Sequence, residues 1–220
     1  MADGEAGSAA IESYNSQLYE SLMTAHIQPL AYTPPYVWIF WTAFLLAYAP
    51  EFALVARSKP AAGETTDRGS MGLIMLVGWL AFPAAFVVAS WSKFAMLNHR
   101  VLWFTFGIVA LLAGSLLRRY CFRTLGRYFT GNVRVLPDQP VIQDGPYHFV
   151  RHPAYTGGML MYLGTGLALT NLLSVLILLS FGGATYAYRV AVEEEALGAA
   201  IGEPYLEYMR RTKRFIPFVF

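Results

Sequence analysis

Charged side chains are scarce in this sequence. Only 14% of the 220 residues are Asp, Glu, Lys or Arg, whereas 56% are hydrophobic, and an ordinary soluble domain is about one quarter charged. A surface this poor in charge needs lipid to solvate it. We therefore predict an integral membrane protein of one domain, with its core divided among spanning helices.

Cysteine is almost absent as well. Cys121 is the single cysteine, which excludes an internal disulfide and any multi-thiolate metal site, and we expect no metal. Cys121 itself is expected to be a small apolar filler. The net charge of only +2, with basic residues beside apolar runs instead of among exposed aromatics, argues against nucleic-acid binding.

The first 35 residues contain no Lys or Arg, although they carry Asp3, Glu5, Glu12 and Glu20. A cleaved signal peptide has a positive n-region, which this segment lacks. We therefore expect residues 1–35 to be a non-cytosolic leader, with the first spanning helix as the insertion signal.

Long apolar runs are plentiful. Runs near 20 residues predict spanning helices at 36–55, 71–91 and 101–117. A longer block, 155–187, is divided by Thr170-Asn171 and predicts a helical hairpin. Each arm has about 16 residues, or roughly 24 Å, slightly short of a ~30 Å hydrocarbon core. The sequence thus predicts an all-α integral membrane protein with about five transmembrane helices, whose last two either span a thin membrane or stop below its far surface.

The basic residues favour one orientation of these helices. With five spans and an inner C-terminus, only Lys93 and Arg100 of the 16 basic residues lie outside. The positive-inside rule then predicts an external N-terminus and a cytosolic C-terminus. We divide the chain into the leader, three transmembrane helices at 36–117, and a C-terminal region at 118–220 that carries the polar clusters.

A basic helix and a loop open this C-terminal region. Arg119, Arg123 and Arg127 recur every four residues opposite an apolar face, which predicts an amphipathic helix leaving the membrane. Its positive stripe is equally suited to anionic headgroups. The polar, Pro- and Gly-rich segment 130–146 then predicts a cytosolic loop.

Three polar clusters follow. In 145–158, a glycine and two prolines fix the backbone while Arg151, His152 and two tyrosines supply donors, charge and aromatic faces. This suits a small-molecule site, and equally an interfacial anchor. The tail at 202–217 is regular in aromatic and basic residues, so it either joins this site or lies on headgroups.

The remaining cluster is 189–195. Arg189 and Glu193 lie four apart on one helix face and can pair with each other, and Glu194 is about 100° further round. As a functional group, the arginine would bind an anion and a glutamate would bind a cation or an amine. The alternative is a solvated run of charge.

Several short motifs occur in a fixed order over residues 117–217. They are Leu125-Gly126-Arg127-Tyr128-Phe129-Thr130, Gly145-Pro146-Tyr147, Val150-Arg151-His152-Pro153-Ala154-Tyr155-Thr156-Gly157, Arg189-Val190, Glu193-Glu194, Leu197, Ile201-Gly202, Tyr205, Tyr208, Arg211-Thr212, Arg214 and Ile216-Pro217. In this order they resemble the isoprenylcysteine carboxyl methyltransferase family and related phospholipid N-methyltransferases. Ile201 stands where the family usually has phenylalanine, and Asp67-Arg68-Gly69-Ser70 resembles bacterial members.

This resemblance implies an enzyme that uses S-adenosylmethionine, with a five-helix membrane core and a cytosol-side cofactor pocket formed by the C-terminal third of the chain. A lipophilic or prenylated acceptor would arrive from the membrane lipid. The resemblance implies catalytic roles for Arg189 and Glu193. It also implies one for Arg118, where the sequence match to the family is weaker. It implies that the cofactor contacts are Gly145, Tyr147, Arg151, His152, Pro153, Tyr155 and Glu194.

The acceptor predicted from this resemblance is the carboxylate of an isoprenylated cysteine or a similar isoprenoid acid. Arg118 and Arg189 favour an oxygen anion, whereas they would hinder an amine. Three alternatives stay open: a phospholipid or amine N-methyltransferase, an NADPH-dependent isoprenoid or sterol reductase, and a non-enzymatic module that binds anionic lipid. The larger helix count of such reductases argues against the second, and the third leaves the ordered polar clusters unexplained.

Overall fold

The computed structural model describes residues 28–57, 67–92, 95–136 and 138–215. These residues form helices and no β-strand beyond two single-residue bridges, as predicted. The predicted leader falls largely on residues 1–27, which lie outside the described residues. The five long helices are α2 (Tyr36–Arg57), α3 (Ser70–Trp91), α4 (Arg100–Leu125), α5 (Pro153–Ala168) and α6 (Leu172–Ile201). The short ones are η1 (Leu30–Tyr32), η3 (Gly126–Tyr128), η4 (Gly145–His148) and α7 (Glu203–Arg211).

Four of these helices, α2, α3, α4 and α6, are long and apolar enough to cross a membrane. The prediction of a multi-pass membrane protein is therefore confirmed. The first arm of the hairpin, α5, has the predicted 16 residues. The second arm is part of a helix of 30 residues, because the charged stretch 189–195, which its spacing predicted to be helical, continues the helix of the apolar run. A total of five spans stays a prediction.

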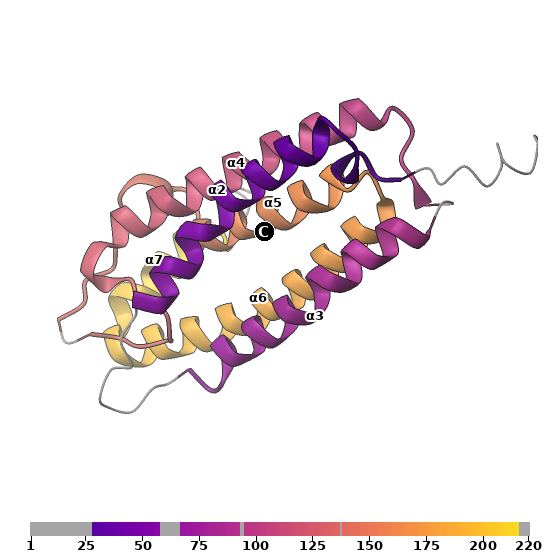
Figure 1. Ribbon diagram of the computed structural model, residues 1–220. Coiled ribbons are helices and arrows are strands. Elements are labelled where there is room, and N and C mark those ends of the chain that lie inside the picture. Colours follow the sequence, from indigo (N-terminus) through magenta and orange to yellow (C-terminus); the bar gives the residue numbers. More distant parts are fainter. Residues whose placement is uncertain (1–27, 58–66, 93–94, 137, 216–220) are drawn as a thin grey trace, which may run out of the picture.

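The long helices run side by side along one axis. Figure 1 shows α2 and α4 on one side of the bundle and α3 and α6 on the other, with α5 between them; the packed pairs are α2 with α4, α4 with α5, α5 with α6 and α6 with α3. We call the end where α6 passes into α7 the α7 end, and the opposite end, where α5 turns into α6, the Asn171 end.

Asn171 holds the turn between α5 and α6. Its Oδ1 accepts a hydrogen bond from Ser174 N at 3.1 Å, which caps α6. Its Nδ2 donates to the carbonyl oxygen of Ser92 at 3.1 Å and to the Ser92 hydroxyl at 3.0 Å. The predicted Thr170-Asn171 break is confirmed, and the same side chain attaches the hairpin to the end of α3.

Glycines bring the backbones of α4 and α5 into contact. Gly107 and Gly114 of α4 face Gly164 and Gly157 of α5, and each pair is seven residues apart. A Cβ on Gly114 would lie 2.5 Å from the carbonyl oxygen of Gly157, and one on Gly164 would lie 2.4 Å from Leu111 N. Small residues allow such close approach, which is a common way for membrane helices to pack without a hydrophobic driving force.

At the Asn171 end, α2 and α3 contact each other through aromatic rings. Phe86 of α3 stacks on Trp41 with ring centroids 5.7 Å apart and an interplanar angle of 11°. Phe44 and Phe82 form an edge contact nearer the middle, with centroids 6.0 Å apart. Beyond these rings, towards the α7 end, the same two helices flank a cavity.

The glycine contact predicts that Gly164→Ala destabilises the bundle, because the new methyl group would collide with the backbone of α4. Overpacking of this kind costs about 1–3 kcal/mol. Thermal unfolding of the detergent-solubilised protein should show a lower midpoint. Gly72→Ala is the matched control, because no atom lies within 4 Å of a Cβ at that position and alanine favours helix. An equal midpoint for the two variants would contradict the proposed backbone contact.

Candidate active site

A cavity of about 470 Å³ lies among the helices and reaches the α7 end, within the usual size range of small-molecule sites. One part of its wall is apolar and comes from α2 and α3, including Phe44, Phe52, Met75, Trp79 and Phe82. The opposite part comes from α4 to α7 and the loop after η3, and it carries the polar side chains.

Seven of the ten predicted site residues line this cavity. They are Arg118, Tyr147, Arg151, His152, Tyr155, Arg189 and Glu193. Gly145, Pro153 and Glu194 are not on its surface. Gly145 has a φ of +55° and packs against the Tyr120 ring, and Pro153 is buried at the first position of α5.

Arg189 is held from three directions. Its Nη1 forms an ion pair with Asp67 and donates to the Ser70 hydroxyl at 2.8 Å, at the start of α3. Its Nη2 donates to the carbonyl oxygen of Gly131 at 2.6 Å. Arg189 therefore pairs with Asp67 and not with Glu193, the partner that the four-residue spacing suggested.

Asp67 organises the segment before α3. Besides Arg189, it accepts hydrogen bonds from Val133 N at 2.9 Å, Met71 N at 3.0 Å and the Ser70 hydroxyl at 2.9 Å. Burial acts to raise the pKa of Asp67, but the two backbone N–H groups and the Arg189 charge outweigh it and leave that pKa below its ordinary value. One carboxylate thus joins α3, α6 and the loop after η3.

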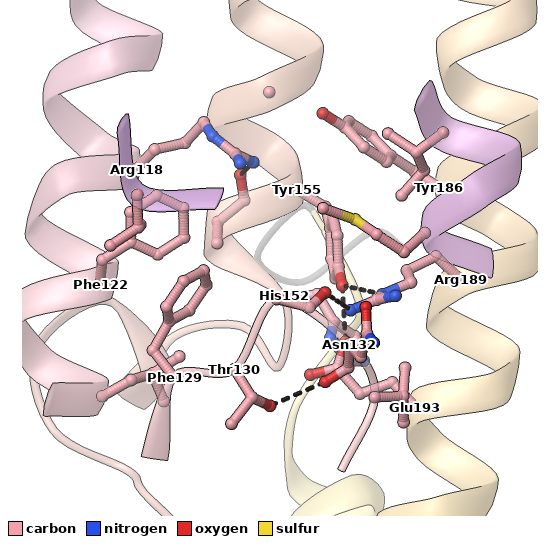
Figure 2. Close-up of a pocket in the computed structure, with 18 of the residues that line it drawn as sticks. Arg118, Phe122, Phe129, Thr130, Asn132, His152, Tyr155, Tyr186, Arg189 and Glu193 are labelled. Carbon is pink, nitrogen blue, oxygen red and sulfur yellow. Dashed lines mark hydrogen bonds between the residues drawn. The ribbon is translucent and has the colours of Figure 1, made fainter. Parts of the chain in front are cut away.

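Tyr155 lies between Arg189 and Glu193. Its hydroxyl accepts a hydrogen bond from Arg189 Nε at 3.3 Å and donates to Glu193 Oε2 at 2.7 Å. Figure 2 shows Arg118 entering the cavity from the α4 wall and Arg189 from the α6 wall, with Tyr155 between them. The three predicted catalytic residues are thus brought to one cavity by helices far apart in the sequence.

Arg118 has its own acidic partner. Its Nη2 donates to Glu51 Oε2 of α2 at 2.7 Å, and its Nη1 donates to the carbonyl oxygen of Ala154 at 2.9 Å. Both members of the Glu51–Arg118 pair are 15% exposed and line the cavity. An acid therefore balances each of the two arginines, Glu51 beside Arg118 and Asp67 beside Arg189.

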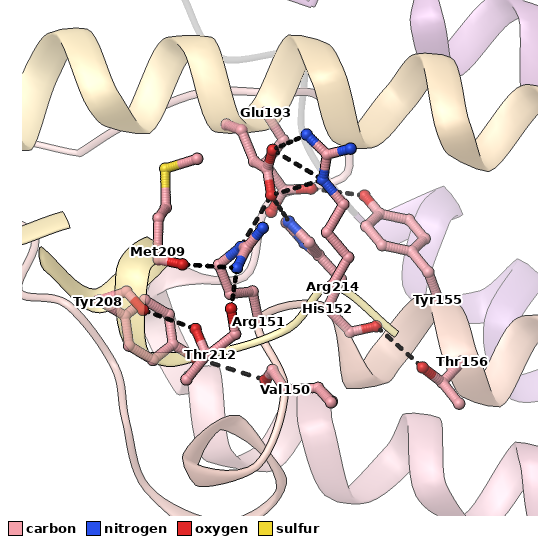
Figure 3. Close-up of polar contacts among 11 residues, drawn as sticks. Val150, Arg151, His152, Tyr155, Thr156, Glu193, Tyr208, Met209, Thr212 and Arg214 are labelled. Atoms are coloured by element: carbon pink, nitrogen blue, oxygen red, sulfur yellow. Dashed lines mark hydrogen bonds and ion pairs between the residues drawn. The ribbon is translucent and has the colours of Figure 1, made fainter. Parts of the chain in front are cut away.

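Glu194 is the centre of a separate ion cluster. It accepts hydrogen bonds from Arg151 Nε at 2.9 Å, His152 Nε2 at 3.2 Å and Arg214 Nη2 at 2.7 Å. The backbone follows the same path, because Arg151 N donates to the Lys213 carbonyl at 2.8 Å and His152 N to the Arg214 carbonyl at 3.0 Å. Figure 3 shows the side chains of Arg151, His152 and Arg214 converging from the α5 entry and the tail.

The tail is fastened to η4 as well. The Tyr208 hydroxyl of α7 donates to the carbonyl oxygen of Tyr147 at 2.5 Å, and burial raises the pKa of Tyr208 to about 12. The predicted tail therefore packs on the polar clusters and contributes Tyr205 and Tyr208 to the cavity wall. These contacts make residues 145–158 and 202–215 one continuous wall.

Comparison with known proteins agrees with this geometry. The sequence profile of the isoprenylcysteine carboxyl methyltransferase family matches residues 106–199, which run from α4 through most of α6. Over these residues, the chain is similar to that family. This match confirms the resemblance of the ordered motifs.

Individual relatives match over different lengths. Protein-S-isoprenylcysteine O-methyltransferase B of Arabidopsis thaliana is 30% identical over 116 residues, which cover 52% of this chain and 59% of that protein. The probable protein-S-isoprenylcysteine O-methyltransferase of Oryza sativa subsp. indica is 27% identical over 196 residues, covering 83% and 96%. The chain thus spans about three fifths of the Arabidopsis protein and nearly all of the rice protein.

A solved structure shares the fold. The structure of the eukaryotic intramembrane Ras methyltransferase ICMT superposes with a TM-score of 0.65 at 22% identity, covering 86% of this chain and 70% of that one. At this identity, the similarity establishes the architecture of the bundle.

Two acidic residues of the site were not among the predicted ones. Glu51 is a lone carboxylate inside the apolar run of α2, and an ionisable residue in a spanning helix is a functional candidate by default. Asp67 directly precedes α3, within the Asp67-Arg68-Gly69-Ser70 segment that resembles bacterial members. Nothing in the linear sequence pairs Glu51 with Arg118 or Asp67 with Arg189, because 67 and 122 residues separate the partners.

We expect Asp67→Asn to destabilise the protein at neutral pH, because it leaves the Arg189 charge without its buried partner. Removing one member of a buried pair costs about 3–5 kcal/mol. The pKa of Asp67 in the folded protein lies below its unfolded value of about 3.9. The ionised carboxylate therefore stabilises the folded protein fully above about pH 3.9, and this stabilisation is lost as the pH falls through the folded pKa. The difference in unfolding midpoint between wild type and variant should therefore be large at pH 7 and shrink below about pH 4.

Glu195→Gln is the control for this change, because the Glu195–Arg68 pair is exposed. It should leave the midpoint unchanged at both pH values. A difference in unfolding midpoint between Asp67→Asn and wild type that stays constant down to pH 3 would contradict the role given to the ionised Asp67.

Proposed function

We propose that this protein transfers a methyl group from S-adenosylmethionine to the carboxylate of an isoprenylated cysteine, or of a similar isoprenoid acid, where membrane and cytosol meet. The observation that carries this proposal is the two-sided cavity. Its apolar wall from α2 and α3 suits a prenyl chain, and its polar wall holds Arg118, Arg189 and Glu193. The relatives named as isoprenylcysteine O-methyltransferases support the same reaction.

The residues of the polar wall fit S-adenosylmethionine. Glu193 lines the cavity, and within the described parts of the chain no Lys, Arg or His forms an ion pair with it. It is therefore available to a cationic ligand. Tyr147, Tyr155 and Tyr205 add aromatic faces that attract a cation. When bound, S-adenosylmethionine supplies an electrophilic methyl group on its sulfonium.

The chain's own residues would orient the acceptor. A carboxylate is already nucleophilic at neutral pH, so its reaction needs alignment and the loss of water more than a general base. Arg118 from α4 and Arg189 from α6 lie on either side of Tyr155 in the polar wall and can hold the carboxylate by directional hydrogen bonds. Because Asp67 and Glu51 balance these arginines, their contribution is orientation more than long-range attraction. Residues 212–215, fastened to the α5 entry, would keep water from that side of the cavity.

The same proposal assigns the membrane orientation. The α7 end carries most of the basic residues, so we infer that it faces the cytosol. The site would then receive the polar methyl donor from water, while the prenyl chain arrives through the lipid along α2 and α3.

The reaction itself is tested by ligand binding and by the chemistry of the product. Calorimetry on detergent-purified protein should show micromolar binding of S-adenosylhomocysteine and no binding of NADPH. Methyl label transferred from S-adenosylmethionine into an N-acetylated, S-prenylated cysteine should be released as methanol by base, because a methyl ester is base-labile. Label that survives base would show transfer to nitrogen and overturn the carboxylate acceptor, and heat with NADPH alone would overturn the methyltransferase.

Two variants separate the roles proposed for the polar wall. Arg189→Ala should reduce methyl transfer at least 100-fold while changing S-adenosylhomocysteine affinity only slightly, because Arg189 is assigned to the acceptor. His152→Ala should weaken S-adenosylhomocysteine binding about tenfold, because it loosens the wall that Glu194 holds together. Arg123→Ala, on the exposed face of α4, is the control and should change neither quantity. The reverse pattern for the first two variants would refute these assignments.

A further inference from the structure

Glu51 is the single acidic residue of α2, in a helix of 22 residues that is otherwise uncharged except for its terminal arginine. Ionised carboxylates in spanning helices are costly and are retained where they have a partner and a task. Its partner is Arg118. The contact between α2 and α4 does not depend on this pair alone, because other hydrogen bonds also join the two helices.

Those other contacts lie one turn before Glu51. Pro50 lacks an N–H, so the Leu46 carbonyl has no helical donor, and the Arg119 guanidinium donates to that oxygen. The Ser115 hydroxyl donates to the neighbouring Ala47 carbonyl at 3.1 Å. The two helices are thus joined through the α2 backbone, without the carboxylate.

The two arginine pairs of the site differ in how firmly the acid is held. Asp67 is fixed by four donors and is not on the cavity surface. Glu51 lines the cavity, and among the described residues the hydrogen bonds recorded for its carboxylate involve Arg118 alone. Arg118 is itself fixed, because it also donates to Ala154 O and lies over the Phe122 ring at 4.9 Å. The acid of this pair can therefore leave while the arginine stays in place.

We propose that Glu51 is a displaceable counter-ion that occupies the acceptor's place on Arg118 and so sets the affinity for anionic acceptors. This inference rests on the proposed function. An acceptor carboxylate binds Arg118 by displacing Glu51, so part of its binding free energy is spent on breaking the existing pair. Methylation converts that carboxylate into a neutral ester, which cannot compete with Glu51 for Arg118. Glu51 then pairs again with Arg118, which favours release of the product.

The test compares the acid form and the methyl ester of an N-acetylated, S-prenylated cysteine on purified wild type and Glu51→Gln. We expect Glu51→Gln to lower the KM for the acid at least fivefold and to strengthen its direct binding by a similar factor. Binding of the ester should change less than twofold. A purely structural role for Glu51 would weaken the binding of both compounds.

Controls keep the result interpretable. Glu203→Gln removes an acid from an exposed pair with Arg210 and should leave both affinities unchanged. S-adenosylhomocysteine binding shows that each variant is folded, and Glu51→Ala, which should also strengthen acid binding, replaces Glu51→Gln if that variant does not fold.

The possible failures are distinct. Wild type that transfers no methyl group to the acid would overturn the proposed function and this inference with it. Wild type that does so, together with unchanged or weaker binding of the acid by both Glu51 variants, would overturn the counter-ion role alone.

Discussion

Compensation of buried charge is the constraint on which the rest of this structure depends. A bundle in lipid cannot bury an arginine without a polar partner, because transferring an isolated charge from water to a low-dielectric interior is far more costly than any single contact can offset. Arg118, Arg189 and Arg151 each meet a carboxylate from a different element, namely Glu51, Asp67 and Glu194. These pairs join α2 to α4, α3 to α6, and the α5 entry to α6 and the tail.

The same pairs shape the site. Because Asp67 also binds Val133 N, the loop after η3 is drawn over the polar end of the cavity. Because Glu194 gathers Arg151, His152 and Arg214, the tail is drawn to the other side. Glu193, the remaining carboxylate on the polar wall, is left with a tyrosine hydroxyl as its recorded partner. Glu193 is thus an available anion among arginines that already have acidic partners. This arrangement is suited to a cationic methyl donor.

The helices were largely predictable from the sequence, whereas the residues at which some of them end were not. Apolar runs located α2, α3 and the first part of α4, because solvation by lipid requires about 20 apolar residues in succession whatever the neighbours are. The hairpin break at Asn171 was predicted for a local reason, since the residue caps the following helix. The spacing of Arg189 and Glu193 placed this charged stretch on a helix, but the continuation of α6 to Ile201 was not predicted, because apolarity does not record tertiary partners such as Asp67 for Arg189.

The sequence by itself determined the class of the protein, its helical composition, its family resemblance and most of the polar side chains that meet in the cavity. These properties follow from local composition and from the order of short motifs. Only the tertiary structure decided the partner of each charge. Arg189 pairs with Asp67 across 122 positions and Arg118 with Glu51 across 67, because the packing of α3 on α6 and of α2 on α4 brings these segments together. Glu194, predicted to contact the cofactor, lies behind the wall for the same reason, since two arginines and a histidine from distant segments converge on it.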